Sequence, residues 1–567
     1  MARSRSRVIG RSAQHRLRRS RADAPRCRAD ERGMAMIMVI MLSTVLVLIP
    51  MTMMTAVIGQ LPLARNDQDR TAALAAAQAG VDDYINRLDN NPDYWEYNAT
   101  TNPPPTANGA LTGYVPVSDL SSNQYHYSVD ASQVETQGLV ELTSYGKSRN
   151  VTRIIKVGLR QVGFLDNLSL SNYNLVDPVL DPVQGTNTTY DCVYDWYKPN
   201  PESHGTGPDL SKCGGLINYW VTGNTLTGPV RSNDDFYICG TPAFEGAVIT
   251  GDPNASDVPY WHDPARCGND APTFSQPSTA SQPIGGGGTI TFPASNAALE
   301  EQVVVGQSGA GCLYSGPTAI TLTGSTMTVV SPDTSTSATN PNCLGTGVAL
   351  PPNGVIYVQN LPTGQSCNVT ITWDGDSNCG DGDVFIQGQL SGQLTVSAEN
   401  NIFITGDLTY DSFTGTTVLG LIANNFVLVN HPVDGNNNTV VGTETFYGST
   451  KFSVPADYGT AACNGGSTNC TVTIDAAILT LLHSFGTSNF SVGGVLGNID
   501  LDGSLAGNFM DIEGVFTGNA QLVDGYNSNY TYDSRLAHLS PPYFLDPADS
   551  YWHSVTFEEC LVTGCSS

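Results

Sequence analysis

Hydrophobic residues dominate one long segment near the start of the chain. Residues 34–58 read MAMIMVIMLSTVLVLIPMTMMTAVI, and no charged residue follows before Arg65. A helix of about 25 residues rises ~1.5 Å per residue and would be ~37 Å long, which is enough to cross a bilayer. Lipid accepts such a helix because its backbone polar groups are paired internally. The pattern predicts a transmembrane or assembly helix over residues 34–62.

Apolar residues continue downstream with helical spacing. Five of them recur at intervals of three and four: Leu74, Ala77, Val81, Ile85 and Leu88. This spacing predicts one apolar stripe on an amphipathic helix. The Asn-Asn-Pro sequence at 90–92 predicts its end, and Pro50, Gly59 and Pro62 predict a kink or break between the two helical segments.

Three segments after a proline-rich loop have the composition and alternation of β-strands, namely 125–131, 138–145 and 151–159. A helix followed by three such strands predicts a compact α+β module over residues 63–162, in which the helix packs on a small antiparallel sheet.

The remainder, residues 163–567, predicts a β-rich head with short strands and an internal boundary near 271–288. Residues 397–404 (SAENNIFI) resemble residues 422–429 (IANNFVLV) at an offset of 24–25 positions, and 247–252 resemble 402–407. A repeat of this length with short strands is typical of a β-solenoid, in which asparagines at turns bond to one another along the stack. We therefore favour a right-handed β-solenoid over the alternative, a disulfide-linked β-sandwich.

Charge divides the chain sharply. The net charge is −27, yet residues 1–33 contain eleven arginines against Asp23, Asp30 and Glu31. Beyond residue 160 there are 38 acidic and six basic residues, so the head would repel phosphate and we expect no nucleic-acid binding by it. The basic leader should stay on the cytoplasmic side of a membrane, with the head outside.

The cysteines also indicate a location outside the cytoplasm. Apart from Cys27 there are twelve, and without CxxC pairs or nearby histidines they predict disulfides rather than zinc sites. Neighbours in sequence suggest six candidate pairs, although connectivity cannot be derived from spacing: Cys192 with Cys213, Cys239 with Cys267, Cys312 with Cys343, Cys367 with Cys379, Cys463 with Cys470, and Cys560 with Cys565.

Two motifs carry a resemblance to a known family. The basic leader ends in Glu-Arg-Gly at residues 31–33 directly before the apolar run, and residues 70–80 read RTAALAAAQAG. The first resembles the prepilin signal of type IV pilins. The second resembles the R-x-x-A-L-x-A-A-E-A-G segment of PilX-type minor pilins, with Gln78 in place of the usual glutamate. Head segments such as 228–234 and 525–545 also look like those of large predicted pilus-assembly proteins.

The resemblance implies a structural role and a processing site. A prepilin peptidase would cut between Gly33 and Met34, where glycine leaves the backbone accessible. Most pilins carry glutamate at the position of Met38, whereas PilX-type minor pilins tend to lack it. The implied protein is a minor pilin-like subunit of a pilus, held by a single membrane pass before assembly, with an extracytoplasmic head at the cell surface. Its partners would be other pilin subunits, the peptidase and the membrane.

Other functions stay open at this point. An uncleaved signal anchor would explain the N-terminus, and the head could be an adhesin for a surface ligand or a polysaccharide-active β-solenoid enzyme. The chain has no P-loop, G-x-S-x-G, H-E-x-x-H or dinucleotide fingerprint. We therefore expect no catalytic site and no cofactor.

One acidic loop is a weak candidate for calcium binding, because its carboxylates alternate with other residues. Cys379 stands where an EF-hand needs glycine, and Phe385 where it needs glutamate. The four candidate ligands are Asp374, Asp376, Asp381 and Asp383.

Overall fold

The computed structural model describes most of the chain beyond residue 31. The described ranges are 32–91, 93–98, 101–118, 122–134, 139–180, 217–251, 271–275, 289–364, 380–431, 471–517, 521–548 and 551–560, with short pieces at 433, 436–439, 442–444 and 454–456. The chain divides into two units, Met1–Asp69 and Arg70–Ser567, each described by itself.

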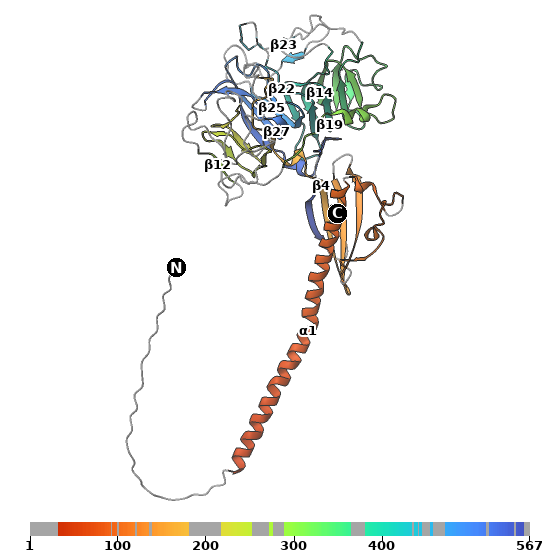
Figure 1. The fold of residues 1–567 in the computed structure, drawn as a ribbon, viewed down its shortest axis with the longest axis vertical. Helices are drawn as coiled ribbons and strands as arrows, with labels where there is room; N and C mark the ends of the chain where they lie inside the picture. The colour runs from red at the N-terminus through yellow and green to blue at the C-terminus, as the bar shows by residue number, and fades with distance from the viewer. Residues whose placement is uncertain are drawn as a thin grey trace, which may run out of the picture. The chain divides into compact units, whose positions relative to one another are not determined.

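Helix α1 runs from Arg32 to Asn90 (Figure 1). Its end before Pro92 agrees with the sequence prediction, and Asn91 N donates to Arg87 O at 3.0 Å. The expected break is absent, because the helix continues through Pro50 and Pro62. A proline removes one backbone hydrogen bond, but its own φ is compatible with a helix. Among the described residues, no helix combines the length and hydropathy needed to cross a membrane.

The second unit begins with a module in which the C-terminal part of α1 packs on a five-stranded antiparallel sheet. The strand order is β1-β2-β3-β4-β30. The bounds are β1 Val115–Pro116, β2 Gln124–Gln133, β3 Leu139–Ser148, β4 Val151–Gln161 and β30 Trp552–Cys560, with the 3-10 turns η1 Tyr94–Glu96 and η2 Gly109–Leu111. The three predicted strands are present as β2, β3 and β4.

Strand β30 was not expected in this sheet. It pairs with β4, with Trp552 opposite Gln161 and Cys560 opposite Ile154, and Trp552 contributes to the module core. The sequence prediction placed everything after residue 162 in the head. The module is instead built from two segments that are about 400 positions apart in the chain.

The helix and the sheet approach each other closely at one glycine. A Cβ on Gly146 would lie 2.0 Å from Ala73 O and 2.2 Å from Ala77 N, and Ser144 Oγ donates to Ala77 O at 2.7 Å. The predicted apolar stripe faces this contact: Ala77, Val81 and Leu88 are buried, whereas Leu74 and Ile85 are half-buried. Small residues on both surfaces allow this distance.

Most described strands of the head belong to one 21-stranded sheet, which we call the coil stack, and we call the segments between its successive parallel-paired strands coils. Its strands form three parallel ladders. The first contains β13 Cys312–Ser315, β17 Val355–Gln359, β19 Gln393–Ala398, β21 Val418–Ala423, β25 Val472–Thr480, β27 Val495–Phe509, β5 Ser169–Tyr173, β8 Val230–Ser232 and β11 Val248–Thr250. The second contains β14 Thr318–Gly324, β18 Val384–Leu390, β20 Ile402–Tyr410, β22 Val427–Val429 and β26 Phe485–Thr487. The third joins the ends of β18 and β20 to β25 and β27, and continues through β29 Leu522–Tyr532, β7 Thr225–Thr227, β10 Ala243–Phe244 and β12 Thr273–Phe274.

Shorter elements complete this region. Strand β15 Thr326–Val330 pairs antiparallel with β14, and β16 Gly345–Ala349 pairs antiparallel with β15. Strand β28 Gly514–Phe516 pairs antiparallel with β29. Two separate pairs are β6 Trp220–Val221 with β9 Ile238–Cys239, which is parallel, and β23 Gly442–Glu444 with β24 Val454–Ala456, which is antiparallel. The 3-10 turns are η3 Phe164–Asp166, η6 Ala297–Val303 and η7 Ser534–Ala537.

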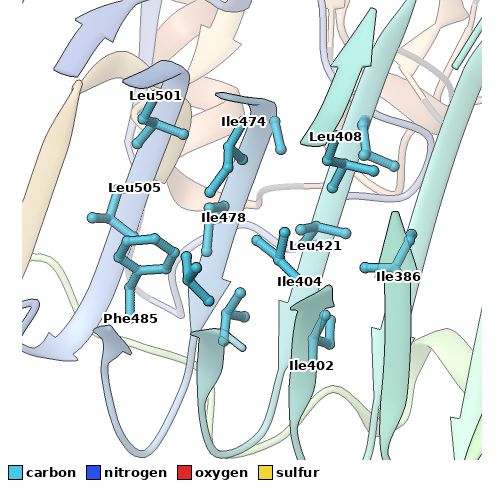
Figure 2. Close-up of a cluster of buried hydrophobic side chains, with 14 of the residues drawn as sticks. Ile386, Ile402, Ile404, Leu408, Leu421, Ile474, Ile478, Phe485, Leu501 and Leu505 are labelled. Carbon is cyan, nitrogen blue, oxygen red and sulfur yellow. The ribbon is translucent and has the colours of Figure 1, made fainter. Parts of the chain in front are cut away.

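Aliphatic side chains of successive coils stack inside the ladders (Figure 2). Ile386 lies opposite Ile404, and Leu421 lies opposite Ile478, whose other neighbour is Leu505. All five are at most 3% exposed. Such rows of Ile and Leu explain why these strands read as nearly continuous apolar runs.

The internal repeat is the register of two adjacent coils. Ser397 lies opposite Ile422 and Ile402 opposite Val427, an offset of 25 positions in both cases. At the turn, Asn425 Nδ2 donates to Asn400 Oδ1, so the expected hydrogen bonding between stacked asparagines is present. The second sequence similarity has no such meaning, because β11 pairs with β8 and not with β20.

The order of coils in space differs from their order in the chain. The C-terminal strands β27 and β29 pair with the N-terminal strands β5 and β7, with Leu505 opposite Ser169 and Tyr530 opposite Leu226. We call this junction the seam. An asparagine ladder crosses it: Asn172 Nδ2 donates to Asn508 Oδ1 at 2.8 Å, and Asn233 Nδ2 to Asn172 Oδ1 at 2.9 Å.

Residues 289–303 run along the first ladder and bond to head residues that lie far apart in the chain. Ile290 N donates to Asn233 Oδ1, Asn296 Nδ2 to Ala398 O, and Gly311 N to the carbonyl of Gln302. A second apolar core forms under this segment. The described strands on both sides of the predicted boundary at 271–288 therefore belong to one sheet.

Candidate functional site

The N-terminal part of α1 exposes an unusual amount of apolar surface. Fourteen large hydrophobic side chains between residues 36 and 54 are 49–75% exposed. They are Met36, Ile37, Met38, Val39, Ile40, Met41, Leu42, Val45, Leu46, Val47, Leu48, Ile49, Met51 and Met54. Exposed contiguous apolar surface of this kind marks an interaction site.

The apolar surface surrounds the helix. Consecutive residues are rotated by about 100° around a helix axis, so the unbroken apolar run 36–42 covers every side. The two polar side chains between residues 36 and 51 form hydrogen bonds to the backbone of their own helix. Ser43 Oγ donates to Ile40 O at 3.0 Å, and Thr44 Oγ1 donates to the same oxygen at 2.9 Å. A helix that is apolar all round is stable only where its surroundings are apolar on all sides.

The predicted processing residues lie at the beginning of this helix. α1 starts at Arg32, so Gly33 and Met34 belong to its first turn. Met38, at the position where most pilins carry glutamate, is 75% exposed. The described part of the chain therefore places the predicted cut next to the exposed apolar surface.

A partly buried polar network fixes the C-terminal end of α1 to the module. Tyr127 OH donates to Asp83 Oδ2 at 2.8 Å, and Arg87 Nε donates to the same carboxylate at 2.9 Å. Asn108 Nδ2 reaches Tyr127 OH at 2.6 Å and Tyr94 OH at 3.0 Å. Burial raises the pKa of Tyr127, so its phenol keeps the proton that it donates to Asp83.

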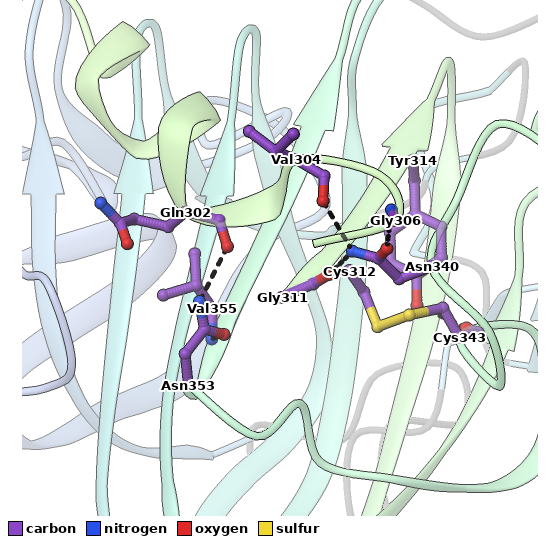
Figure 3. The surroundings of a disulfide bond; sticks show 10 residues. All are labelled: Gln302, Val304, Gly306, Gly311, Cys312, Tyr314, Asn340, Cys343, Asn353 and Val355. Atoms are coloured by element: carbon purple, nitrogen blue, oxygen red, sulfur yellow. Dashed lines mark hydrogen bonds between the residues drawn. A yellow bond between two sulfur atoms is a disulfide. The ribbon is translucent and has the colours of Figure 1, made fainter. Parts of the chain in front are cut away.

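Cys312 and Cys343 form a disulfide at one end of the coil stack (Figure 3). Asn340, near Cys343, donates from Nδ2 to Gly311 O at 2.6 Å and accepts from Gly306 N at 2.8 Å. The segment thus covers the outer edge of β13, where unpaired backbone groups would otherwise be open to another strand.

The remaining predicted pairs lie partly outside the described residues. Cys239 and Cys560 are disulfide-bonded. The other candidates fall in ranges that the structure does not describe: Cys192, Cys213, Cys267, Cys367, Cys379, Cys463, Cys470 and Cys565.

The calcium candidate is only half described. Asp374 and Asp376 lie outside the described residues. Asp383 is fully buried, and its Oδ1 accepts from Asn400 Nδ2 at 2.7 Å and from Asn401 N at 3.1 Å. Its role in the described structure is to join two coils. Over the described ranges, no group of three or more His, Cys, Asp or Glu side chains could hold a metal ion.

One buried polar cluster in the coil stack was not expected from the sequence. Tyr530 OH donates to Asp511 Oδ2 at 2.9 Å and also contacts Glu513 Oε1, while Ser528 Oγ donates to Glu513 Oε2 at 3.1 Å. Burial, followed by the nearby Asp511 carboxylate, raises the pKa of Glu513 well above its usual value. Both carboxyl groups are only 6% exposed, so the cluster can hold a proton but offers little access to a substrate. An Asp-x-Glu in sequence gives no signal of it.

Comparisons with known proteins add little. No protein-family model matches the chain, and no curated protein matches it. Among solved structures, it is similar to the competence-associated pilin ComZ from Thermus thermophilus, with 13% identity, 87% of this chain and 98% of that chain covered, and a TM-score of 0.24. At this TM-score the likeness carries no argument about function.

Proposed function

We propose that this chain is a minor pilin-like structural subunit of a type IV pilus or a related filament. The observation that carries the proposal is the contrast within α1: it is apolar on all sides and exposed over residues 36–51, yet packed by one stripe on an antiparallel sheet at its C-terminal end. A helix of this kind suits a bundle of similar helices, where each side meets another apolar helix.

Before assembly, the same apolar segment would sit in the membrane, with the leader on the cytoplasmic side and the second unit outside. The prepilin peptidase would then cut after Gly33 and leave Met34 as the N-terminus. The partners in this proposal are other pilin subunits, the peptidase and the membrane. The PilX-type motif at residues 70–80 supports the minor-pilin subclass.

The head in this proposal is a β-solenoid without catalytic role or cofactor. Parallel pairing between successive coils supports this over a β-sandwich, whose sheets are antiparallel. A compact body of ~470 residues has a radius of gyration of ~23 Å, whereas helices pack ~8–10 Å apart. If every subunit of the filament carried a head of this size, neighbouring heads would collide. We therefore place the protein at the tip or at low copy number. Immunogold labelling along the whole shaft would contradict that placement.

The first test is the N-terminus of the protein extracted from cells with and without the prepilin peptidase. We expect a methylated peptide beginning at Met34 only when the peptidase is present. Mass spectrometry identifies the N-terminal peptide in each of the two strains directly. An intact leader in both strains would exclude a pilin-class subunit and favour an uncleaved surface anchor.

The second test changes the exposed apolar surface. Leu46→Lys places a charge in the middle of the apolar segment, at a cost of about 2.5–3.5 kcal/mol in a lipid-like environment. We expect loss of the protein from purified filaments, with unchanged thermal unfolding of the second unit. The control is Gln68→Lys, an exposed position outside the apolar run, which should be incorporated normally.

A further inference from the structure

An aromatic turn lies on the surface of the module. Residues 94–97 read YWEY and include η1. Trp95 and Tyr97 are half-buried and pack against the module core, so their positions are fixed while part of each ring stays exposed. Tyr94 holds Tyr97 in an edge-to-face contact with 5.5 Å between ring centroids. The rings are therefore preorganised and lose little conformational freedom on binding a ligand.

Two hollows share Tyr97 in their linings. One has a volume of about 500 Å³ and lies between the aromatic turn and strand β2. The other, of about 400 Å³, lies between Tyr97 and the end of α1, where Asn86 and Asn90 contribute side chains. Both volumes fall in the range of small-molecule sites.

The walls of the larger hollow differ in chemistry. Trp95 and Tyr97 form the aromatic wall, and the opposite wall on β2 carries the small side chains of Ser128, Ala131 and Ser132. Ser128 and Ser132 are exposed, and the Ser132 hydroxyl also bonds to the Asp130 carboxylate. Hydroxyl-bearing and aromatic residues therefore line the same hollow. A flat ring opposite hydroxyl groups fits a sugar, whose C–H face packs on an aromatic ring while its hydroxyls form hydrogen bonds.

Charge in the hollows disfavours an acidic ligand. Arg87 is the one basic residue among the described residues that line them, and Asp83 already pairs with its guanidinium at 2.9 Å. Glu96, also in the larger hollow, adds a negative charge. Phosphate, sulfate or uronic-acid groups would find no available counter-charge.

We propose that the aromatic turn and the facing part of β2 form a binding site for a neutral saccharide. Trp95 and Tyr97 stack on the sugar rings, and Ser128 and Ser132 bond to the hydroxyls. The site belongs to the module and does not depend on how the N-terminal helix is processed or assembled.

The experiment measures binding of cellotetraose and chitotetraose to the full-length protein in detergent micelles, by calorimetry and by tryptophan fluorescence. A polygalacturonate fragment of equal length is the acidic comparison. We expect saturable binding of at least one neutral tetrasaccharide and none of the acidic one. No binding of either neutral probe, or preference for the acidic one, overturns the proposal.

Two variants change residues on opposite walls of the larger hollow. Tyr97→Ser removes a stacking ring, and we expect about tenfold weaker binding. Ser132→Trp fills the hollow from β2 and leaves the residues of the aromatic turn unsubstituted, and it should abolish binding even if Tyr97→Ser proves unstable. Tyr114→Ser is the matched control, since Tyr114 is 39% exposed in the same module but lines neither hollow.

Unchanged affinity in both variants overturns the proposal. So does a crosslink from Ser132→Cys to another pilin subunit in intact filaments, because the hollow would then be a protein contact. N-terminal processing is read separately, so failure here leaves the proposed filament role untouched.

Discussion

Apart from strand β30, the module buries its hydrophobic side chains through contacts of much shorter sequence range than the coil stack does. In the module, neighbouring strands such as β3 and β4 are joined by a short turn, with Ser148 opposite Val151. In the coil stack, paired residues lie 18 positions apart at Ile386 and Ile404, and 336 apart at Leu505 and Ser169. Contacts between neighbours in sequence produce a periodic pattern within one stretch of the chain. The pairing at the seam joins distant segments and produces no such pattern.

The largest expected effect follows from the close approach in the module. Gly146→Val places atoms where Ala73 O and Ala77 N already lie, so α1 must move away from β3. We expect a loss of about 4 kcal/mol or more in the stability of the module, above the usual overpacking cost of about 1–3 kcal/mol, because the clash is with backbone atoms. Hydrogen exchange of the full chain should show loss of protection in residues 70–90 and in β3, with the coil stack unchanged.

Gly113→Ala is the control for this substitution, because nothing lies within 4 Å of its added Cβ. Wild-type protection in Gly146→Val would mean that the helix and sheet are not held at this distance. Equal loss in the coil stack would show that the two regions do not unfold separately.

The second effect belongs to the end of the coil stack. The Cys312–Cys343 disulfide spans 31 positions, and loop closure of this length is worth about 3–4 kcal/mol. The double variant Cys312→Ser with Cys343→Ser should lower the unfolding free energy of the coil stack by that amount, seen as a lower denaturant midpoint, and leave the module midpoint in place. A shift confined to the module would contradict the separation of the two regions.

The sequence allows the helix and strands β2–β4 of the module and the coils adjacent in the chain to be predicted. It does not allow β30 or the seam to be predicted. The apolar stripe of α1 and the alternation in β3 lie within one window of sequence, so helix and strands could be predicted. The offset of 25 also marks two coils that are consecutive in the chain. Strand β30 and the pairing of β29 with β7 depend on residues hundreds of positions apart, and no local pattern records such a partner.

The exposed apolar surface of α1 could be predicted from composition, whereas the hollow beside the aromatic turn could not. A run of 25 apolar residues stands out in any window. The YWEY turn looks like ordinary core residues, since aromatics are most often buried. Its half-exposed rings depend on the path of residues 93–98 beside β2, which only the folded module determines.

The third prediction concerns pH and distinguishes the interior of the coil stack from the module. The pKa of Glu513 is raised in the folded chain, so the native state holds a proton that the unfolded state releases above a pKa of about 4.3. Stability is therefore greatest below that pH and falls as the pH rises toward the folded pKa. The slope is at most about 1.4 kcal/mol per pH unit for one group.

Glu513→Gln should flatten this slope in the coil stack, measured as denaturant midpoints between pH 4.5 and 8. Asp475, whose pKa burial raises to about 6, contributes a fall of the same sign that remains in the variant. The groups facing Glu513 are Asp511, Tyr530 and Ser528. Asp511→Asn is a second test variant, because it removes a carboxylate that raises the pKa of Glu513, and it should also reduce the slope. An unchanged slope in both variants would mean that the cluster does not retain its proton.

The smallest effect tests the seam itself. Asn172→Ala removes two side-chain hydrogen bonds that join Asn508 and Asn233 to it, and we expect a loss of about 1–2 kcal/mol. Asn425→Ala, which breaks a similar bond between consecutive coils, should cost a comparable amount. The two variants should differ in where the loss appears. Because the seam joins strands from opposite ends of the head, only Asn172→Ala should selectively increase hydrogen exchange in β5, β7 and β8. If both variants raised exchange in the same strands, the seam would be no weaker than any other junction between coils.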